Sequence, residues 1–149
     1  MRAVIQRVSS ARVMIGGREH SRIGTGILVL IGVEKDDTAG DAQSLARRIV
    51  ELRIFEDEQG KMNRALTEAQ GEILSVSQFT LLGDCRKGRR PSFEPAARPE
   101  AARELYERFV SDIEAMGVRV ATGVFQAMMD VELTNQGPVT FILDSRKRF

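Results

Sequence analysis

Two hydroxyl groups and one amide lie within four residues in the segment Ser77-Gln78-Phe79-Thr80. Hydroxyl and amide side chains hold polar substrates and water by hydrogen bonds, and here they flank the aromatic ring of Phe79. The same residues are also typical of a strand end whose side chains alternate between core and solvent. The segment is therefore a candidate site, and the rest of the chain must decide between the two interpretations.

The residues that most often carry nucleophilic catalysis or bind metals are scarce. The 149-residue chain has one histidine, His20, and one cysteine, Cys85. A structural zinc site needs about four Cys or His ligands, so one chain cannot build it, and an intrachain disulfide is impossible. His20 lies in a polar stretch beside an expected hairpin, which is typical of a surface histidine, and Cys85 is interpreted as a structural residue. We therefore expect no metal and no cofactor, and a catalytic triad would have to use His20.

A Gly-Pro pair interrupts an expected strand in the segment Asn135-Gln136-Gly137-Pro138-Val139-Thr140. Proline cannot donate a ladder hydrogen bond, so its presence inside a strand needs a reason. A plain turn between two strands would also account for it.

The formal net charge is +1, from 22 Lys and Arg against 21 Asp and Glu. A near-neutral total by itself argues against a nucleic-acid partner. The charge is distributed unevenly along the chain, however. Residues 34–74 and 99–133 carry a net negative charge, whereas residues 1–33, 75–98 and 134–149 carry a net positive charge. The sharpest basic cluster is Arg86-Lys87-Gly88-Arg89-Arg90, which is either a solvated loop or a contact for a phosphate backbone.

Short segments rich in β-branched residues predict strands near the N-terminus of the chain. Residues 3–8 and 11–15 predict strands, and Gly16-Gly17 suits a tight hairpin turn. The continuous apolar run 27–31 predicts a strand that is buried on both faces. These elements indicate an antiparallel meander.

Two helices are predicted. The first begins near Thr38, which has capping-box spacing with Asp41. The second begins at Pro99, a favoured first helical position, and ends at Gly117. Their apolar residues repeat at helical spacing: Ala42, Leu45, Ala46, Ile49 and Leu52 in the first, and Ala102, Leu105, Phe109, Ile113 and Met116 in the second.

The length of the chain predicts one domain, residues 1–149. Further strands are expected at 73–79, 118–122, 129–134 and 139–144, with a loop at 83–98. The expected architecture is a single α/β (or α+β) domain, in which two main helices pack on a mostly antiparallel sheet. The most apolar run, 26–33, is far below the ~20 residues of a membrane helix, and the start of the chain does not read as a signal peptide. We expect a cytoplasmic protein with no membrane contact.

Together and in this order, the motifs resemble those of the D-aminoacyl-tRNA deacylase family. The similarity runs nearly end to end, through residues 1–8, 52–55, 60–63, 77–81, 87–93 and 135–140. The most specific motifs are Ser77-Gln78-Phe79-Thr80 and Gly137-Pro138. The resemblance implies a barrel-like sheet core and hydrolysis of the ester that joins a D-amino acid, or mischarged glycine, to the 3′-terminal adenosine of tRNA.

The resemblance also implies a homodimer with the active site at the subunit interface. Ser77, Gln78, Phe79 and Thr80 of one subunit would line the pocket, the last three in the catalytic role. Gly137-Pro138 of the other subunit would enter it through a cis peptide bond. Phe125 and Met129 resemble the adenosine pocket of the family, and the tRNA backbone would meet the basic cluster: Arg86, Lys87, Arg89 and Arg90.

A mechanism without a protein base is consistent with this composition. An aminoacyl ester is already activated, so backbone N–H groups near Phe79 and Thr80 could stabilise the oxyanion, and in this family the adenosine 2′-hydroxyl is thought to assist. Thr80 as a covalent nucleophile would need an activating base. A rigid Gly137-Pro138 unit would exclude the L side chain by steric clash and admit glycine.

Two other classes of function stay open on the sequence. One is a nucleic-acid-binding module built on the basic loop without catalysis. The other is a general esterase that uses Thr80 or Ser77.

Overall fold

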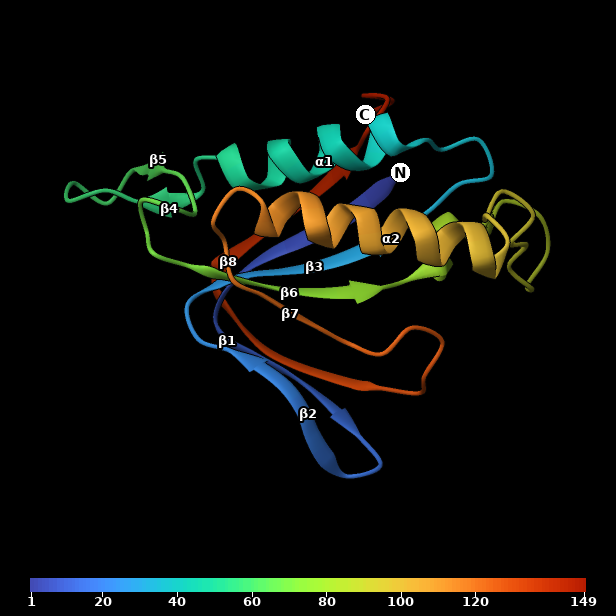
Figure 1. The fold of residues 1–149 in the computed structure, drawn as a ribbon, viewed down its shortest axis with the longest axis horizontal. Coiled ribbons are helices and arrows are strands. Elements are labelled where there is room, and N and C mark those ends of the chain that lie inside the picture. The colour runs from blue at the N-terminus through green and yellow to red at the C-terminus, as the bar shows by residue number, and fades with distance from the viewer.

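A curled mixed sheet carries two helices side by side on one face (Figure 1). The structure is a computed structural model that describes residues 1–149. The main sheet has the order β2-β1-β3-β6-β7, and β8 pairs with β1. Its strands are β1 (Arg2–Ile15), β2 (Arg18–Ile23), β3 (Gly26–Gly32), β6 (Glu72–Ser77), β7 (Val120–Thr122) and β8 (Asp130–Asp144). A small hairpin of β4 (Phe55–Glu56) and β5 (Met62–Arg64) lies beyond one end of the helices.

The N-terminal meander forms as the sequence predicts, with one difference. Gly16 and Gly17 have φ of 56° and 75° and make the turn between β1 and β2. Residues 3–8 and 11–15 form one 14-residue strand and not two. The gap between these two predicted strands, at residues 9 and 10, does not occur, because Ser10 stays paired with Thr134 of β8.

Helix α1 (Ala39–Glu51) begins with the predicted capping box between Thr38 and Asp41. Helix α2 (Pro99–Glu114) has Pro99 in its first turn, and Gly117 follows it with φ of 81°. One expected stripe residue is wrong, since Met116 is exposed. The buried stripe of α2 consists of Tyr106, Phe109 and Ile113.

The sheet is mixed because each helix is a crossover. The chain passes from β3 through α1 to β6 and from β6 through α2 to β7, and both pairs of strands are parallel. Each helix carries the chain back to the end of the sheet at which the preceding strand began. The next strand therefore runs in the same direction, and the two strands pair in parallel. The pairings of β1 with β2, β3 and β8 are antiparallel, as expected.

Strand β3 is buried on both faces, as its apolar run predicts. Ile27, Val29 and Ile31 belong to the main core between the sheet and the helices. Leu28 belongs to a second cluster on the opposite face, inside the curl of the sheet. The curl nearly closes into a barrel, because the Ser21 hydroxyl of β2 donates a hydrogen bond of 2.8 Å to the Thr122 carbonyl of β7.

Two strand ends differ from the sequence prediction in the region of the candidate motifs. Strand β6 ends at Ser77 and not at residue 79, because residues Phe79–Leu82 form a 3₁₀ turn, η1. The segments 129–134 and 139–144 belong to the single strand β8, and residues 136–139 form a bulge opposite Arg7 of β1. No helix is long and apolar enough to span a membrane.

Candidate active site

Two of the three predicted groups of pocket residues, the Ser77 motif and the pair Phe125 and Met129, follow neighbouring strands that end at the same edge of the sheet. Because β6 and β7 are parallel, their carboxyl ends lie at the same edge, where open α/β sheets bind ligands. The motif from Ser77 to Thr80 follows β6 directly, and the loop that holds Phe125 and Met129 follows β7. The parallel pairing of β6 and β7 therefore places these two segments at neighbouring strand ends, which the sequence alone did not predict.

The 3₁₀ turn η1 redirects the chain after β6. The Gln78 N–H makes a last bond of 2.7 Å to the Ile31 carbonyl of β3, and the Gly83 N–H closes the turn on the Thr80 carbonyl at 3.0 Å. The first N–H groups of such a turn have no partner inside it, so those of Phe79 and Thr80 are free to donate. The Gln78 amide donates a short hydrogen bond to the Thr80 hydroxyl.

An exposed aromatic wall stands beside this turn. Phe79 is 57% exposed, and its ring meets the ring of Phe93 edge to face at 5.0 Å and 65°. Phe93 comes from the loop that follows η1. A Cβ atom at Gly83 would lie 3.0 Å from both the Phe93 ring and the Thr80 carbonyl oxygen, so a larger residue here would push the loop away from the turn by a few tenths of an ångström.

Arg2 of β1 supports the turn through a hydrogen bond and was not predicted as a site residue. Its Nη1 donates a hydrogen bond of 2.8 Å to the Leu81 carbonyl of η1. Its Nη2 lies 3.7 Å from Glu34, which also pairs with Arg148 at 2.7 Å. Ion pairs therefore connect Arg148 through Glu34 to Arg2, which binds the backbone of η1.

The loop after β7 is packed tightly under α2. The Tyr106 hydroxyl donates to the Ser75 carbonyl of β6 at 2.9 Å, and burial raises the pKa of Tyr106, so the phenol stays a donor. Its ring lies 6.1 Å from that of Phe125. Met129 accepts a hydrogen bond from Val124 N–H at 3.3 Å, so its sulfur closes the loop. Phe125 and Met129 are thereby fixed next to the last residues of β6.

Arg7 clamps the Gly-Pro bulge and was also not predicted. Its guanidinium is 6% exposed and lies 3.6 Å from Glu56. It donates to the Gln136 carbonyl at 2.9 Å and to the Ile54 carbonyl at 2.7 Å. The peptide bond between Gly137 and Pro138 is cis, as the resemblance implies, and both residues are exposed.

One protomer does not bring Gly137-Pro138 to the Ser77 motif. β8, β1, β3 and β6 are successive neighbours, so three strand spacings separate β8 from β6. The bulge also lies level with Ile27 and Ile73, four residues before Ser77. Strand spacing and rise put the bulge roughly 20 Å from Ser77 of the same chain.

The basic cluster divides into paired and unpaired charges. Arg86 pairs with Asp84 at 2.7 Å, and hydrogen bonds from the Arg86 side chain and backbone lower the pKa of Asp84 to about 2. Lys87, Arg89 and Arg90 are exposed and make no ion pair. Lys87, Arg89 and Arg90 are therefore stronger candidates for a phosphate contact than Arg86.

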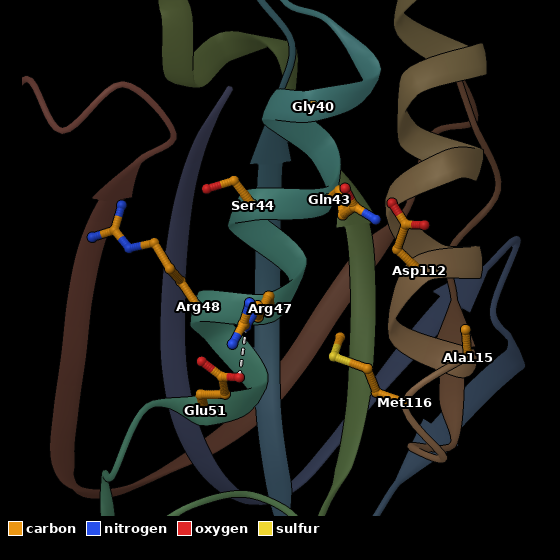
Figure 2. A pocket seen from close by; sticks show the side chains of 9 residues that line it. All are labelled: Gly40, Gln43, Ser44, Arg47, Arg48, Glu51, Asp112, Ala115 and Met116. Atoms are coloured by element: carbon orange, nitrogen blue, oxygen red, sulfur yellow. Dashed lines mark hydrogen bonds and ion pairs between the residues drawn. The ribbon is translucent and has the colours of Figure 1, made fainter.

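His20, Cys85 and the groove between the two helices lie apart from the predicted site residues. His20 is exposed, as expected, and Cys85 is also exposed. An open groove of about 640 Å³ lies between α1 and α2 (Figure 2) and contains none of the predicted site residues. Arg47 and Glu51 pair within it at 2.8 Å, and its Asp112 pairs with Arg108 at 2.9 Å.

Comparisons with known proteins identify the family of the chain. The family described as D-Tyr-tRNA(Tyr) deacylase matches residues 4–144. The D-aminoacyl-tRNA deacylase of Koribacter versatilis (strain Ellin345) is 59% identical over 149 residues, and the match covers 100% of both chains. The solved structure of the c-Myc DNA Unwinding Element Binding Protein superposes with a TM-score of 0.91 at 41% identity, covering 97% of this chain and 98% of that chain.

A more distant structure shares the fold. That of a probable eukaryotic D-amino acid tRNA deacylase has a TM-score of 0.83 at 21% identity and covers 96% of this chain and 98% of that chain. From the family match and the full-length identity, the chain belongs to the D-aminoacyl-tRNA deacylase family, whose members are hydrolases that edit aminoacylated tRNA.

Proposed function

We propose that the chain hydrolyses the ester between a D-amino acid, or glycine, and the 3′-terminal adenosine of tRNA. The observation that carries the proposal is the junction of the β6 motif with the loop after β7. Gln78, Phe79 and Thr80 would surround the ester, and Phe125 and Met129 would take the adenosine ring. An aromatic ring and a polarisable thioether suit the flat face of a base.

The pocket is completed by a second copy of the chain. Gly137-Pro138 is exposed and too far from Ser77 of its own protomer to contribute there. β8 is also an edge strand that exposes apolar side chains, with Leu133, Phe141 and Ile142 at 36%, 37% and 58%. An unpaired strand edge with apolar residues is a surface that a partner covers. A C2 dimer would present each bulge to the pocket of the other subunit.

Catalysis would rest on positioning and hydrogen bonds and not on a protein base. The free N–H groups of Phe79 and Thr80 can stabilise the oxyanion that forms when water attacks the ester. The Thr80 hydroxyl already accepts a hydrogen bond from Gln78, and no ionisable side chain forms a hydrogen bond with it. That arrangement supports Thr80 as a positioning residue, with the adenosine 2′-hydroxyl assisting the proton transfer.

Chirality would be selected by exclusion. L and D esters carry the same groups, so a wall on one side separates them better than an added attraction. The bulge held by Arg7 supplies a rigid wall, and glycine has no side chain to meet it.

A paired hydrolysis assay tests the proposal. D-Tyr-tRNA should lose its amino acid rapidly in the presence of the protein, whereas L-Tyr-tRNA should decay at its spontaneous rate. A terminal 2′-deoxyadenosine should abolish most of the acceleration. Equal rates for the D and L esters would refute the chiral wall, and an undiminished rate with the 2′-deoxy substrate would refute the RNA-assisted step.

A second candidate is binding of nucleic acid without catalysis. The unpaired Lys87, Arg89 and Arg90 favour it, as does the likeness to a protein described as binding DNA. In that case single-stranded DNA would bind with a steep salt dependence, and neither aminoacyl ester would be hydrolysed faster than in buffer.

A further inference from the structure

Arg103 is a cation held over an aromatic ring beside the proposed pocket. It lies in the second turn of α2, is exposed, and has its guanidinium carbon 4.9 Å from the centroid of the Phe125 ring. This distance is within the range of cation–π attraction. Phe125 packs against the main core, so the platform beneath the guanidinium is fixed. Stacking on the ring leaves the N–H groups of Arg103 free to bind an anion.

No carboxylate neutralises this arginine. Arg108, on the same helix, pairs with Asp112 four residues later at 2.9 Å. The corresponding acidic neighbour of Arg103 is Glu107, and the two make no ion pair. Because α2 carries more acidic than basic residues, it repels a phosphate backbone over most of its surface. An unpaired cation at this point can therefore define where an RNA strand passes.

We propose that Arg103 binds the phosphate that joins the terminal adenosine to the preceding nucleotide of the RNA. The inference rests on the proposed function, which places that adenosine against Phe125 and Met129. Since Arg103 touches the same ring, its free N–H groups lie beside the nucleotide that occupies the pocket. A planar guanidinium presents paired donors that match two phosphate oxygens, which a single ammonium does not.

The test compares substrates with and without the phosphate. Arg103→Gln should raise the KM for D-Tyr-tRNA about fivefold with little change in kcat, as expected for an exposed charge contact. It should lower the slope of log KM against log salt by about one. Hydrolysis of D-tyrosyl-adenosine, which has no phosphate, should be unchanged. Arg103→Lys should restore only part of the loss.

Arg108→Gln is the matched control, because Arg108 lies on the same helix and its charge is already paired; it should leave every rate unchanged. Equal losses on both substrates would overturn the proposal, since Arg103 would then only support Phe125. Wild-type rates on both substrates would overturn it as well.

Binding of uncharged tRNA, measured in parallel, separates the two levels of the argument. Weaker tRNA binding by Arg103→Gln, together with no hydrolysis by the unaltered protein, would refute the proposed function and keep the phosphate contact.

Discussion

Replacing Arg7 by methionine should loosen the bulge that carries Gly137-Pro138. Methionine fills a similar part of the buried volume but donates no hydrogen bond. The substitution therefore leaves the Gln136 and Ile54 carbonyls without their donor, at 2.9 Å and 2.7 Å in the unaltered protein.

The size of the effect follows from these contacts. Each hydrogen bond to a charged group contributes about 1.5–3 kcal/mol. Burial of the guanidinium costs several kcal/mol, which methionine avoids and which offsets part of the loss. A net destabilisation of about 3 kcal/mol is expected, or a fall in Tm of about 6–12 °C for a chain of this length. Displacement of the bulge by about 1 Å should lower kcat/KM for D-Tyr-tRNA by roughly 100-fold.

Thermal unfolding and D-Tyr-tRNA hydrolysis, measured on the same samples, test both parts. Arg12→Met is the control in the same strand, because the Arg12–Glu132 pair of 2.7 Å is exposed and contributes at most about 1 kcal/mol. Arg7→Lys should recover only part of the loss, since one ammonium cannot reach both carbonyls as the guanidinium does. A Tm and a kcat/KM that both stay at the unaltered values in Arg7→Met would refute the clamp.

Three further outcomes are expected. Arg89→Gln should lower the salt slope of tRNA binding by about one, whereas Arg86→Gln, whose charge is already paired, should not; equal slopes would contradict the division of the loop. Ile142→Asp should convert a dimer to a monomer in sedimentation and abolish hydrolysis, and an active monomer would refute the shared site. The stabilisation that Asp41 and Asp144 provide should be complete above about pH 5 and be lost progressively toward pH 2. Hydrogen bonds from Ser145 and Thr38 outweigh burial and hold the pKa of Asp41 at about 2, and that of Asp144 is lowered in the same sense by Arg148. Depressed pKa values stabilise the fold only while the carboxylates are ionised, so an unchanged unfolding free energy between pH 5 and pH 2 would contradict this origin.

Local signals in the sequence predict local structure well. Thr38 and Asp41 mark the start of α1, Pro99 marks the start of α2, and Gly16-Gly17 marks the first turn. These signals work because a cap or a tight turn is decided by residues three or four positions apart.

Local sequence patterns do not predict contacts between segments that are distant in the chain. The pairing of β3 with β6 and the clamp of Arg7 on Gln136 join residues tens of positions apart or more. One signal was present for Arg7, which follows Ala3 and Ile5 on the inward face of β1. A charged residue in a buried register needs partners, and here the partners are backbone carbonyls that no local pattern shows.

The alternation of strands and helices from β3 to β7 would have predicted the parallel pairings. The pattern of strand, helix, strand, helix and strand is the usual mark of parallel neighbours. It was obscured by the antiparallel meander before it and by the small hairpin between α1 and β6.

The central claim is that each active site takes residues from two chains, and mixed dimers test it most directly. Thr80→Arg should block the pocket of its own chain, and Pro138→Glu should block the pocket of the partner; both positions are exposed and should tolerate the change. Either variant alone should be inactive on D-Tyr-tRNA. Refolding the two together in equal amounts should restore about one quarter of the unaltered activity, because half of the dimers are mixed and each mixed dimer has one intact site. Mixtures that stay inactive although mixed dimers form would contradict a shared site.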